Sequence, residues 1–299
     1  MTAIALYARA TAGFDERVAH VVAMLQSAAV EHGGRIVQAT SLGAEDMVLT
    51  DLIARHQIDI AIATLDTGRL HAQTLALVPQ IEARYGRTVE VFRPPSEAVI
   101  RFVKANGADS MRDSIAQRKA CCDLRKLEPL SRMLAGRTAW VTGLRREQSD
   151  ARAIVPFGEA DANGRVKLNP LADWSWADVW HYIALHEVPY NPLHDAFMPS
   201  IGCEPCTRAI PVGADFRSGR WWWESETARE CGLHVSPHSA DAQASRPLRS
   251  NGGHASAQAD FGNAEVKGAP APGRSQSESA RECGLHVHEH AMTQTAGAL

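Results

Sequence analysis

A chain of 299 residues with 45% hydrophobic and 22% charged side chains can bury a sizeable core, so we expect a globular protein. Its formal net charge of −3 argues against nucleic acid as the main partner, although a small anionic ligand needs only a local arginine cluster. No apolar run approaches the ~20 residues that cross a bilayer, and no basic region precedes the first apolar stretch. We therefore expect a cytoplasmic protein without a membrane partner, in which cysteine pairs bind metal or act in catalysis.

The hydrophobic pattern predicts helices and strands in alternation from the N-terminus onward. Apolar residues recur at helical spacing from about Phe14 to Glu31, and a second helix carries Met47 to Ile53. Short apolar runs predict strands at 35–40, 58–65, 88–92 and 138–143, with a further helix at about 71–85. This rhythm is typical of an α/β fold, in which helices cover both faces of a twisted parallel sheet. Ligands of such sheets bind beyond the carboxyl ends of the strands.

Three polar loops follow the predicted strands and are candidates for a nucleotide site. Ser41-Leu42-Gly43 opens a helix and could present N–H groups to an anion, but it lacks the G-K-[ST] ending of a Walker loop. Asp66-Thr67-Gly68-Arg69 offers groups that suit a ribose and a phosphate. The segment 143–149, with Arg145, and the nearby Arg152 could grip a phosphate or sulfate. Each loop taken alone could equally be an ordinary turn, or a solvated charged one.

Four of the six cysteines form two close pairs that could converge on one metal centre. Cys121 and Cys122 are adjacent, and Cys203 and Cys206 form a C-x-x-C. Zinc, an iron–sulfur cluster, a redox C-x-x-C and unrelated thiols all remain open. Adjacent cysteines suit separate iron corners better than one tetrahedral ion, which favours the cluster. Lys126, on the same predicted helix, could balance the thiolate charge.

The other two cysteines, Cys231 and Cys283, each lie in the pentapeptide ECGLH. The segments 225–235 and 277–287 are nearly identical copies, SETARECGLHV and SESARECGLHV. Nearby cations would raise the thiolate fraction of Cys231, although a spare exposed thiol is the alternative interpretation. Residues 236–276 are rich in Ser, Ala, Gly, Pro, Asn and Gln, which predicts disorder. We therefore expect a catalytic domain at 1–235 and a predominantly disordered tail at 236–299.

Taken together, these motifs resemble the assimilatory adenylyl-sulfate (APS) reductases, in the group that also contains the phosphoadenylyl-sulfate (PAPS) reductases. The resemblance covers about residues 30–235 in order. It is carried by SLGAEDMVL, LDTGRL, CCDLRK, VTGLRREQS, NPLHDAFMPSIGCEPCTR, GRWWWE and ECGLH. It implies an adenine nucleotide alpha-hydrolase-like fold. It also implies one [4Fe–4S] cluster per chain on Cys121, Cys122, Cys203 and Cys206, since members without these pairs typically use PAPS and hold no cluster.

The implied reaction is the reduction of APS to sulfite with release of AMP, in sulfate assimilation and cysteine biosynthesis. An S-sulfocysteine forms on Cys231, and thioredoxin or glutaredoxin then frees the sulfite. The residues that the resemblance assigns to catalysis are Cys231, His234, Lys126, Arg217 and Arg220, with a C-terminal catalytic arm at 217–235. Those assigned to substrate binding are Ser41, Gly43, Asp66, Gly143, Arg145 and Arg152.

The duplicated ECGLH departs from the family pattern, and other functions remain open at this point. Cys231 follows Cys206 and GRWWWE at the spacing usual in the family, which favours it over Cys283 as the nucleophile. The nearest alternative is a PAPS reductase. A more remote one is a zinc-binding nucleotide-binding protein or a tRNA-thiolation protein on the same fold. The sequence leaves the oligomeric state open, a homo-oligomer included.

Overall fold

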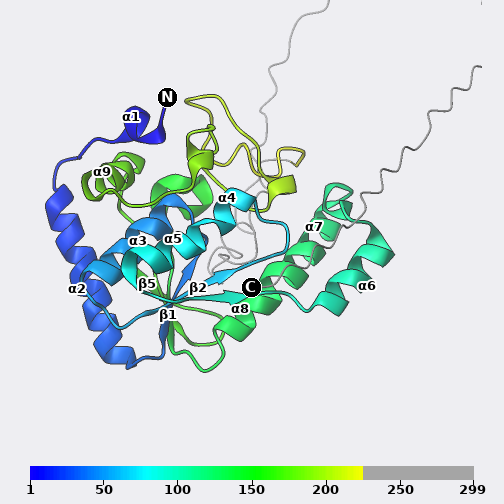
Figure 1. The fold of residues 1–299 in the computed structure, drawn as a ribbon, viewed down its shortest axis with the longest axis horizontal. Helices are drawn as coiled ribbons and strands as arrows, with labels where there is room; N and C mark the ends of the chain where they lie inside the picture. The colour runs from blue at the N-terminus through cyan, green and yellow to red at the C-terminus, as the bar shows by residue number, and fades with distance from the viewer. Residues whose placement is uncertain (225–299) are drawn as a thin grey trace, which may run out of the picture. The chain divides into compact units, whose positions relative to one another are not determined.

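A six-stranded sheet organises residues 1–224, the part of the chain that this computed structural model describes. The strands run in the order β3-β2-β1-β4-β6-β5, and every neighbouring pair is parallel except β5 with β6 (Figure 1). Their bounds are β1 Ile36–Thr40, β2 Ala61–Leu65, β3 Val89–Phe92, β4 Ala139–Val141, β5 Gly158–Ala160 and β6 Val166–Leu168. The predicted α/β class with a parallel sheet is confirmed.

The helices of the described residues include those that apolar periodicity predicted at 14–31 and 47–53, which are α2 and α3, and several that it did not predict. Their bounds are α1 Ala3–Tyr7, α2 Phe14–His32, α3 Ala44–Arg55, α4 Ala72–Leu75, α5 Leu77–Tyr85, α6 Ser96–Asn106, α7 Ile115–Cys122, α8 Glu128–Met133 and α9 Trp176–His186. The helix predicted at 71–85 is wrong as a single element, because it is divided into α4 and α5. Pro79 explains the break: its ring lacks an N–H and would clash with the carbonyl of Leu75 in a continuous helix.

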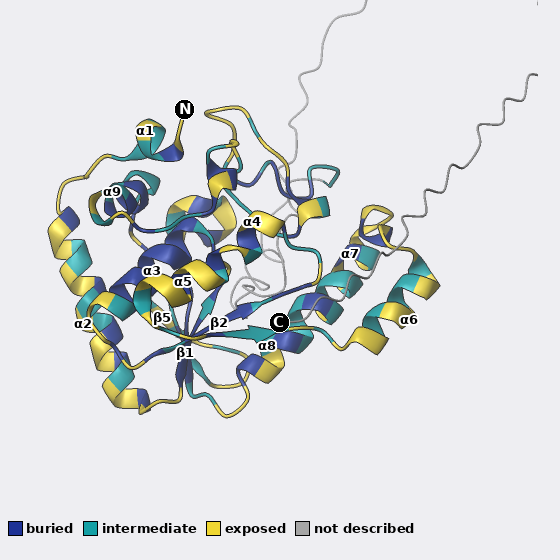
Figure 2. Ribbon diagram, in the orientation of Figure 1, coloured by how far each residue is buried: buried dark blue, intermediate teal, exposed yellow. Residues whose placement is uncertain are grey.

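Helices cover both faces of the sheet. On one face α2, α3, α5 and α9 pack in a large apolar core, and on the other α8 covers a smaller cluster around Val37 and Trp140. Residues 44–53 of α3 are all buried, since this helix contacts both β1 and α9 (Figure 2). None of the helices among the described residues has the length and apolar character needed to cross a bilayer.

The antiparallel β5–β6 hairpin was not predicted from the sequence. Its two strands are three residues each, too short for a clear alternation of polar and apolar side chains. The turn is closed by Asp161, whose Oδ1 accepts from the N–H groups of Asn163 at 2.8 Å and Arg165 at 3.0 Å. Gly164 has a φ of +76°, a backbone conformation that favours glycine.

Parallel pairing brings the three polar loops to one edge of the sheet. Thr40 at the end of β1 pairs with Thr64 of β2, and Gln38 pairs with Val141 of β4. The three strands therefore end at about the same level. Their following loops, which begin at Ser41, Asp66 and Thr142, meet at the edge where α/β proteins bind ligands.

Candidate active site

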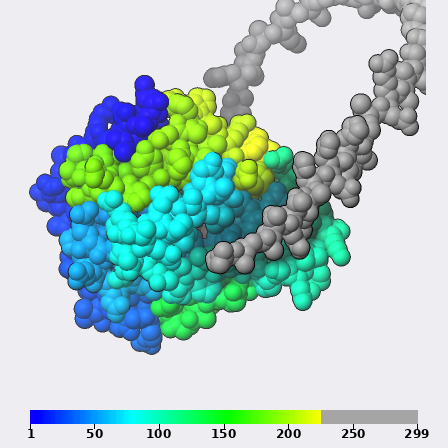
Figure 3. Space-filling view, viewed as in Figure 1, coloured from blue at the N-terminus to red at the C-terminus, as the bar shows by residue number. Residues whose placement is uncertain are grey.

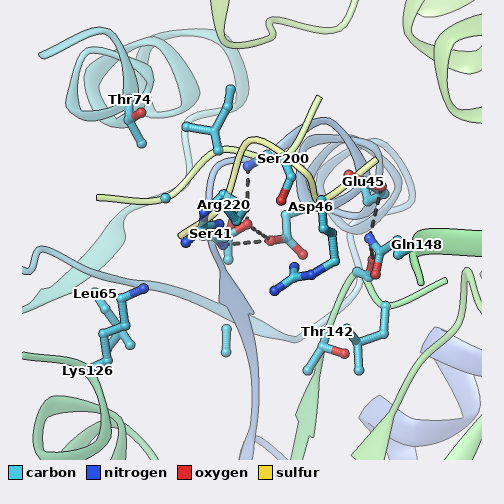
Figure 4. Close-up of a pocket in the computed structure, with 18 of the residues that line it drawn as sticks. Ser41, Glu45, Asp46, Leu65, Thr74, Lys126, Thr142, Gln148, Ser200 and Arg220 are labelled. Carbon is cyan, nitrogen blue, oxygen red and sulfur yellow. Dashed lines mark hydrogen bonds between the residues drawn. The ribbon is translucent and has the colours of Figure 1, made fainter. Parts of the chain in front are cut away.

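A cavity of about 200 Å³ lies at this carboxyl edge of the sheet (Figure 4). One part of its wall is apolar and is formed by Ala39, Leu65, Leu130, Met133 and Trp140. Another part is polar and cationic. Among the residues that the sequence assigned to substrate binding or catalysis, those lining the cavity are Ser41, Gly43, Lys126, Gly143, Arg152, Arg217 and Arg220.

The loop after β1 is held by the carboxylate of Asp46, in the first turn of α3. Asp46 Oδ2 accepts hydrogen bonds from the backbone N and the Oγ of Ser41, both at 2.6 Å. Burial raises the pKa of Asp46 to about 6, with a smaller contribution from Glu45, and the Ser41 hydrogen bonds oppose the rise. Asp46 was quoted within SLGAED but not assigned a role, because its contact with Ser41 is visible only in the folded loop.

Gly143 permits the loop after β4 to pass close to the start of α3. A Cβ atom at this position would lie 2.5 Å from Asp46 Oδ1 and 2.9 Å from Glu45 Cβ. Both contacts are shorter than van der Waals separation, so a side chain here would displace one of the two loops. The glycine therefore lets the two loops form one wall of the cavity.

Arg145 does not line the cavity, although the sequence placed it among the substrate-binding residues. Its Nε lies 3.0 Å from Glu45 Oε1, and its guanidinium carbon lies 5.2 Å from the centre of the Trp176 ring. Gln148 Nε2 donates to the same Glu45 oxygen at 3.0 Å, and Gln148 Oε1 accepts from Arg152 Nη1 at 2.6 Å. A buried network thus runs from Arg145 through Glu45 and Gln148 to Arg152, and Arg145 is the member of it that does not line the cavity. Nothing in the segment 143–149 indicated that Gln148 would link these charges.

Asp66 also lies outside the cavity lining. Its Oδ2 lies 2.9 Å from Arg93 Nε, and its Oδ1 accepts from the backbone N of Gly68 at 3.0 Å. The next residue, Thr67, does line the cavity. Thr67 Oγ1 is also 3.2 Å from Cys203 Sγ, so this loop connects the cavity to the cysteines.

Among residues 1–224, four cations line the cavity and create a site for an anion: Lys126, Arg152, Arg217 and Arg220. Arg220 is held by a hydrogen bond from its Nε to the carbonyl oxygen of Cys206, at 3.2 Å. A Cβ on Gly202 would overlap the Arg220 guanidinium, so the glycine leaves room for this cation. In Figure 4 Lys126 is drawn apart from Ser41 and Asp46, which are joined by hydrogen bonds. The combination suits a flat base attached to a charged phosphate or sulfate.

His194 is a cavity residue that was quoted within a motif but not assigned. It is buried, and neither of its ring nitrogens has a hydrogen-bond partner among the described residues. Burial lowers the pKa of His194 to about 4, so the ring is neutral at physiological pH. The edges of Trp176 and Trp180 pack around it, with ring centres 5.9 and 5.3 Å away.

The four paired cysteines gather around a second, much smaller cavity of about 20 Å³. Cys121 and Cys122 are the last residues of α7, whereas Cys203 and Cys206 bracket a short turn. None of the four thiols forms a disulfide with another described cysteine, and burial raises the pKa of both Cys121 and Cys206. The cations that also line this cavity are Arg69, Arg118, Arg125 and Lys126.

The donor set has the chemistry of an iron–sulfur site: four thiols from two segments, with cations close enough to balance thiolate charge. Within residues 1–224, no group of three or more His, Cys, Asp or Glu side chains is arranged to hold one metal ion.

Trp221 and Lys126 line both cavities and form the wall between them. The guanidinium carbons of Arg118 and Arg220 lie 4.5 and 4.7 Å from the centre of the Trp221 ring. Such contacts between cations and an aromatic ring are favourable in a site from which water is excluded. Trp221 is the first residue of the tryptophan run 221–223 and is 1% exposed.

The remaining predicted residues lie outside the part of the chain that the structure describes. These are Cys231 and His234, the arm beyond Glu224, and the second ECGLH copy with Cys283.

Comparison with known proteins identifies the family. The model of the phosphoadenosine phosphosulfate reductase domain matches residues 35–209. An adenosine 5′-phosphosulfate reductase of Allochromatium vinosum is 58% identical over 200 residues, covering 67% of this chain and 78% of that protein. The Burkholderia cepacia protein of that name is 51% identical over 218 residues, covering 72% and 87%. A crystal structure of phosphoadenylyl-sulfate (PAPS) reductase from Candida auris, a phosphate complex, is 32% identical with a TM-score of 0.49, covering 57% and 81%. Since the domain model matches more than half of the chain, the protein belongs to the phosphoadenosine phosphosulfate reductase family.

Proposed function

We propose that this protein reduces adenosine 5′-phosphosulfate (APS) to sulfite and AMP. One observation carries the proposal: a cavity with an apolar part and four cations lies directly beside four gathered thiols. The apolar part suits adenine, and the cations suit the phosphosulfate. The names of the relatives, which are adenosine 5′-phosphosulfate reductases, support the choice of APS.

The reaction follows from the nucleophile that the sequence offers. The thiolate of Cys231 attacks the sulfur atom of bound APS, a sulfur–sulfur bond forms, and the bond from sulfur to the phosphate oxygen breaks. AMP leaves with that electron pair and an S-sulfocysteine remains. A thiolate of thioredoxin or glutaredoxin then attacks the Cys231 sulfur and sulfite leaves. The second thiol of the reductant resolves the mixed disulfide, so the dithiol supplies both electrons.

The residues of the cavity lower the cost of bringing a thiolate to a sulfate that is already anionic. Lys126, Arg152, Arg217 and Arg220 offset this repulsion, and they do so within a pocket of low dielectric constant. Asp46 and Gly143 shape the loops against which the nucleotide binds. His194 is neutral and so adds no charge of its own.

The four cysteines would hold one [4Fe–4S] cluster, as we infer from their shared cavity and its cations. When bound, the cluster would supply a fixed charge and a rigid frame next to Lys126. The four described cysteines form no disulfide with one another, as is typical of proteins in a reducing compartment, and this supports placement in the cytoplasm.

Turnover with purified protein tests the proposal. Supplied with APS and reduced thioredoxin, the wild type should release sulfite and AMP, and it should prefer APS to PAPS. Cys231→Ser should be inactive, whereas Cys283→Ser should retain turnover as the matched control. If the protein prefers PAPS, the substrate is PAPS and not APS. Full turnover by Cys231→Ser, together with an inactive Cys283→Ser, would overturn the assignment of the nucleophile.

A further inference from the structure

We propose that the buried ion pair between Arg118 and Glu224 is a positioning device for the reaction. It fixes the point from which the segment bearing Cys231 starts. This inference rests on the proposed function, because it takes Cys231 as the nucleophile. Neither residue was assigned a role from the sequence.

The ion pair is short and almost completely buried. Arg118 Nε lies 2.6 Å from Glu224 Oε1, and the two side chains are 1% and 4% exposed. Two buried charges cost desolvation energy, and a pair of this kind can often be replaced by apolar side chains without loss of stability. Geometric specificity therefore explains its presence better than stability does.

Each end of the pair belongs to a different part of the site. Arg118 is on α7, lines the thiol cavity, and precedes Cys121 by one helical turn. Glu224 is the last described residue, and its N–H donates to the carbonyl of Trp221 at 2.9 Å. Trp221 has a φ of +42°, a conformation that a bulky residue adopts only when its surroundings hold it there. The ion pair thus ties the start of the arm to the helix that carries two of the cysteines.

Further cations hold the rest of the tryptophan run. The guanidinium carbon of Arg112 lies 5.8 Å from the ring centre of Trp222 and 5.6 Å from that of Trp223. The guanidinium carbon of Arg208 lies 5.1 Å from the ring centre of Trp222. In Figure 3 the yellow surface of the last described residues adjoins the green-cyan surface around α7. Contacts on three consecutive tryptophans leave the backbone little freedom before Glu224.

A fixed origin matters because the tether to Cys231 is short. Cys231 follows Glu224 by seven positions, which can span at most roughly 25 Å. The distance from Glu224 to Cys231 therefore cannot exceed this length. If Glu224 is displaced, the thiol is placed less well against the substrate, and a displacement of about 1 Å can cost roughly 100-fold in rate.

The test measures formation of the adduct in a single turnover on full-length protein. Glu224→Gln should slow the appearance of S-sulfocysteine on Cys231 by roughly 10- to 100-fold, and Glu224→Asp should recover part of the rate. The affinity for AMP should stay within about twofold, because neither residue lines the nucleotide cavity. Glu97→Gln, in the exposed pair with Arg101 on α6, is the control and should leave the rate unchanged.

A second variant separates positioning from stability. Arg118→Met with Glu224→Met removes both charges, so it should melt near the wild-type temperature yet still form the adduct slowly. A wild-type rate in this double variant, or in a folded Glu224→Gln, would overturn the inference while leaving the proposed function intact. If wild-type protein forms no adduct with APS, the proposed function itself fails.

Discussion

Asp46 illustrates what burial does to a single acid in this site. Its carboxyl lies against Ser41 at the start of α3, and burial raises its pKa from 3.8 to about 6. The folded protein therefore holds the proton more tightly than the unfolded chain does. The stabilising contribution of the proton is complete below about pH 4 and is lost as the pH rises through about 6.

Replacement of this acid should remove the pH dependence that it causes. Between pH 4 and 7 the free energy of unfolding of the wild type should fall by about 1–3 kcal/mol relative to Asp46→Asn. Urea denaturation of both proteins across this range measures the difference. The comparison cancels other titrating groups, including His194, whose lowered pKa acts with the opposite sign. A difference that does not vary with pH would contradict the burial argument.

Motifs located most of the cavity residues but could not show their partners. Ser41, Gly143 and Arg152 line the cavity, and all were assigned from motifs of the family resemblance that lie in or near loops after predicted strands. Arg145 was chosen for the same reason, yet it pairs with Glu45, about a hundred positions earlier in the chain. A sequence shows that an arginine is present but not which distant carboxylate it meets. The burial of His194 was also not predictable, because it depends on Trp176 and Trp180, which pack against the ring only in the folded chain.

At the scale of elements, the close approach of the loop after β4 to the start of α3 depends on the absence of a side chain at Gly143. Gly143→Ala places a Cβ in contact with Asp46 and Glu45, so the loop after β4 and the start of α3 must separate. Stability should fall by about 1–3 kcal/mol from overpacking, and AMP binding should weaken by roughly tenfold. Urea denaturation and calorimetric titration with AMP measure the two effects.

The matched control for this substitution is Gly158→Ala on β5. There the nearest atom to an added Cβ is Leu168 Cδ2, at 3.4 Å, and the position is exposed. This protein should bind AMP as the wild type does and lose little stability. Equal behaviour of the two alanine variants would mean that the close approach at Gly143 is not needed.

Long periodic elements were predictable and short ones were not. The helix α2 and the strand β1 begin and end within one residue of the expected bounds, because each buries one continuous apolar pattern. The division between α4 and α5 was missed because periodicity continues through Pro79. The sequence also gave no expectation for α6, in which none of the residues is buried.

For the molecule as a whole, the thiol cavity and the main apolar core are separate clusters. Loss of one thiol should therefore remove iron without unfolding the sheet. We expect Cys203→Ser to lose its iron and visible absorption and to melt several degrees lower, while its far-ultraviolet circular dichroism is retained.

Iron analysis and thermal melting of anaerobically purified protein check this expectation. Cys283→Ser is the control, because Cys283 belongs to neither of the two cysteine pairs, and it should keep the iron content of the wild type. If Cys203→Ser holds as much iron as the wild type, the four cysteines are not the ligands.

The wall formed by Lys126 and Trp221 has a thermodynamic consequence. Linkage between two sites is reciprocal. If iron bound at the thiols changes the affinity for the nucleotide by some factor, bound nucleotide changes the affinity for iron by the same factor. Measuring how much iron the protein retains in saturating AMP therefore gives the sign of this coupling without any assay of catalysis.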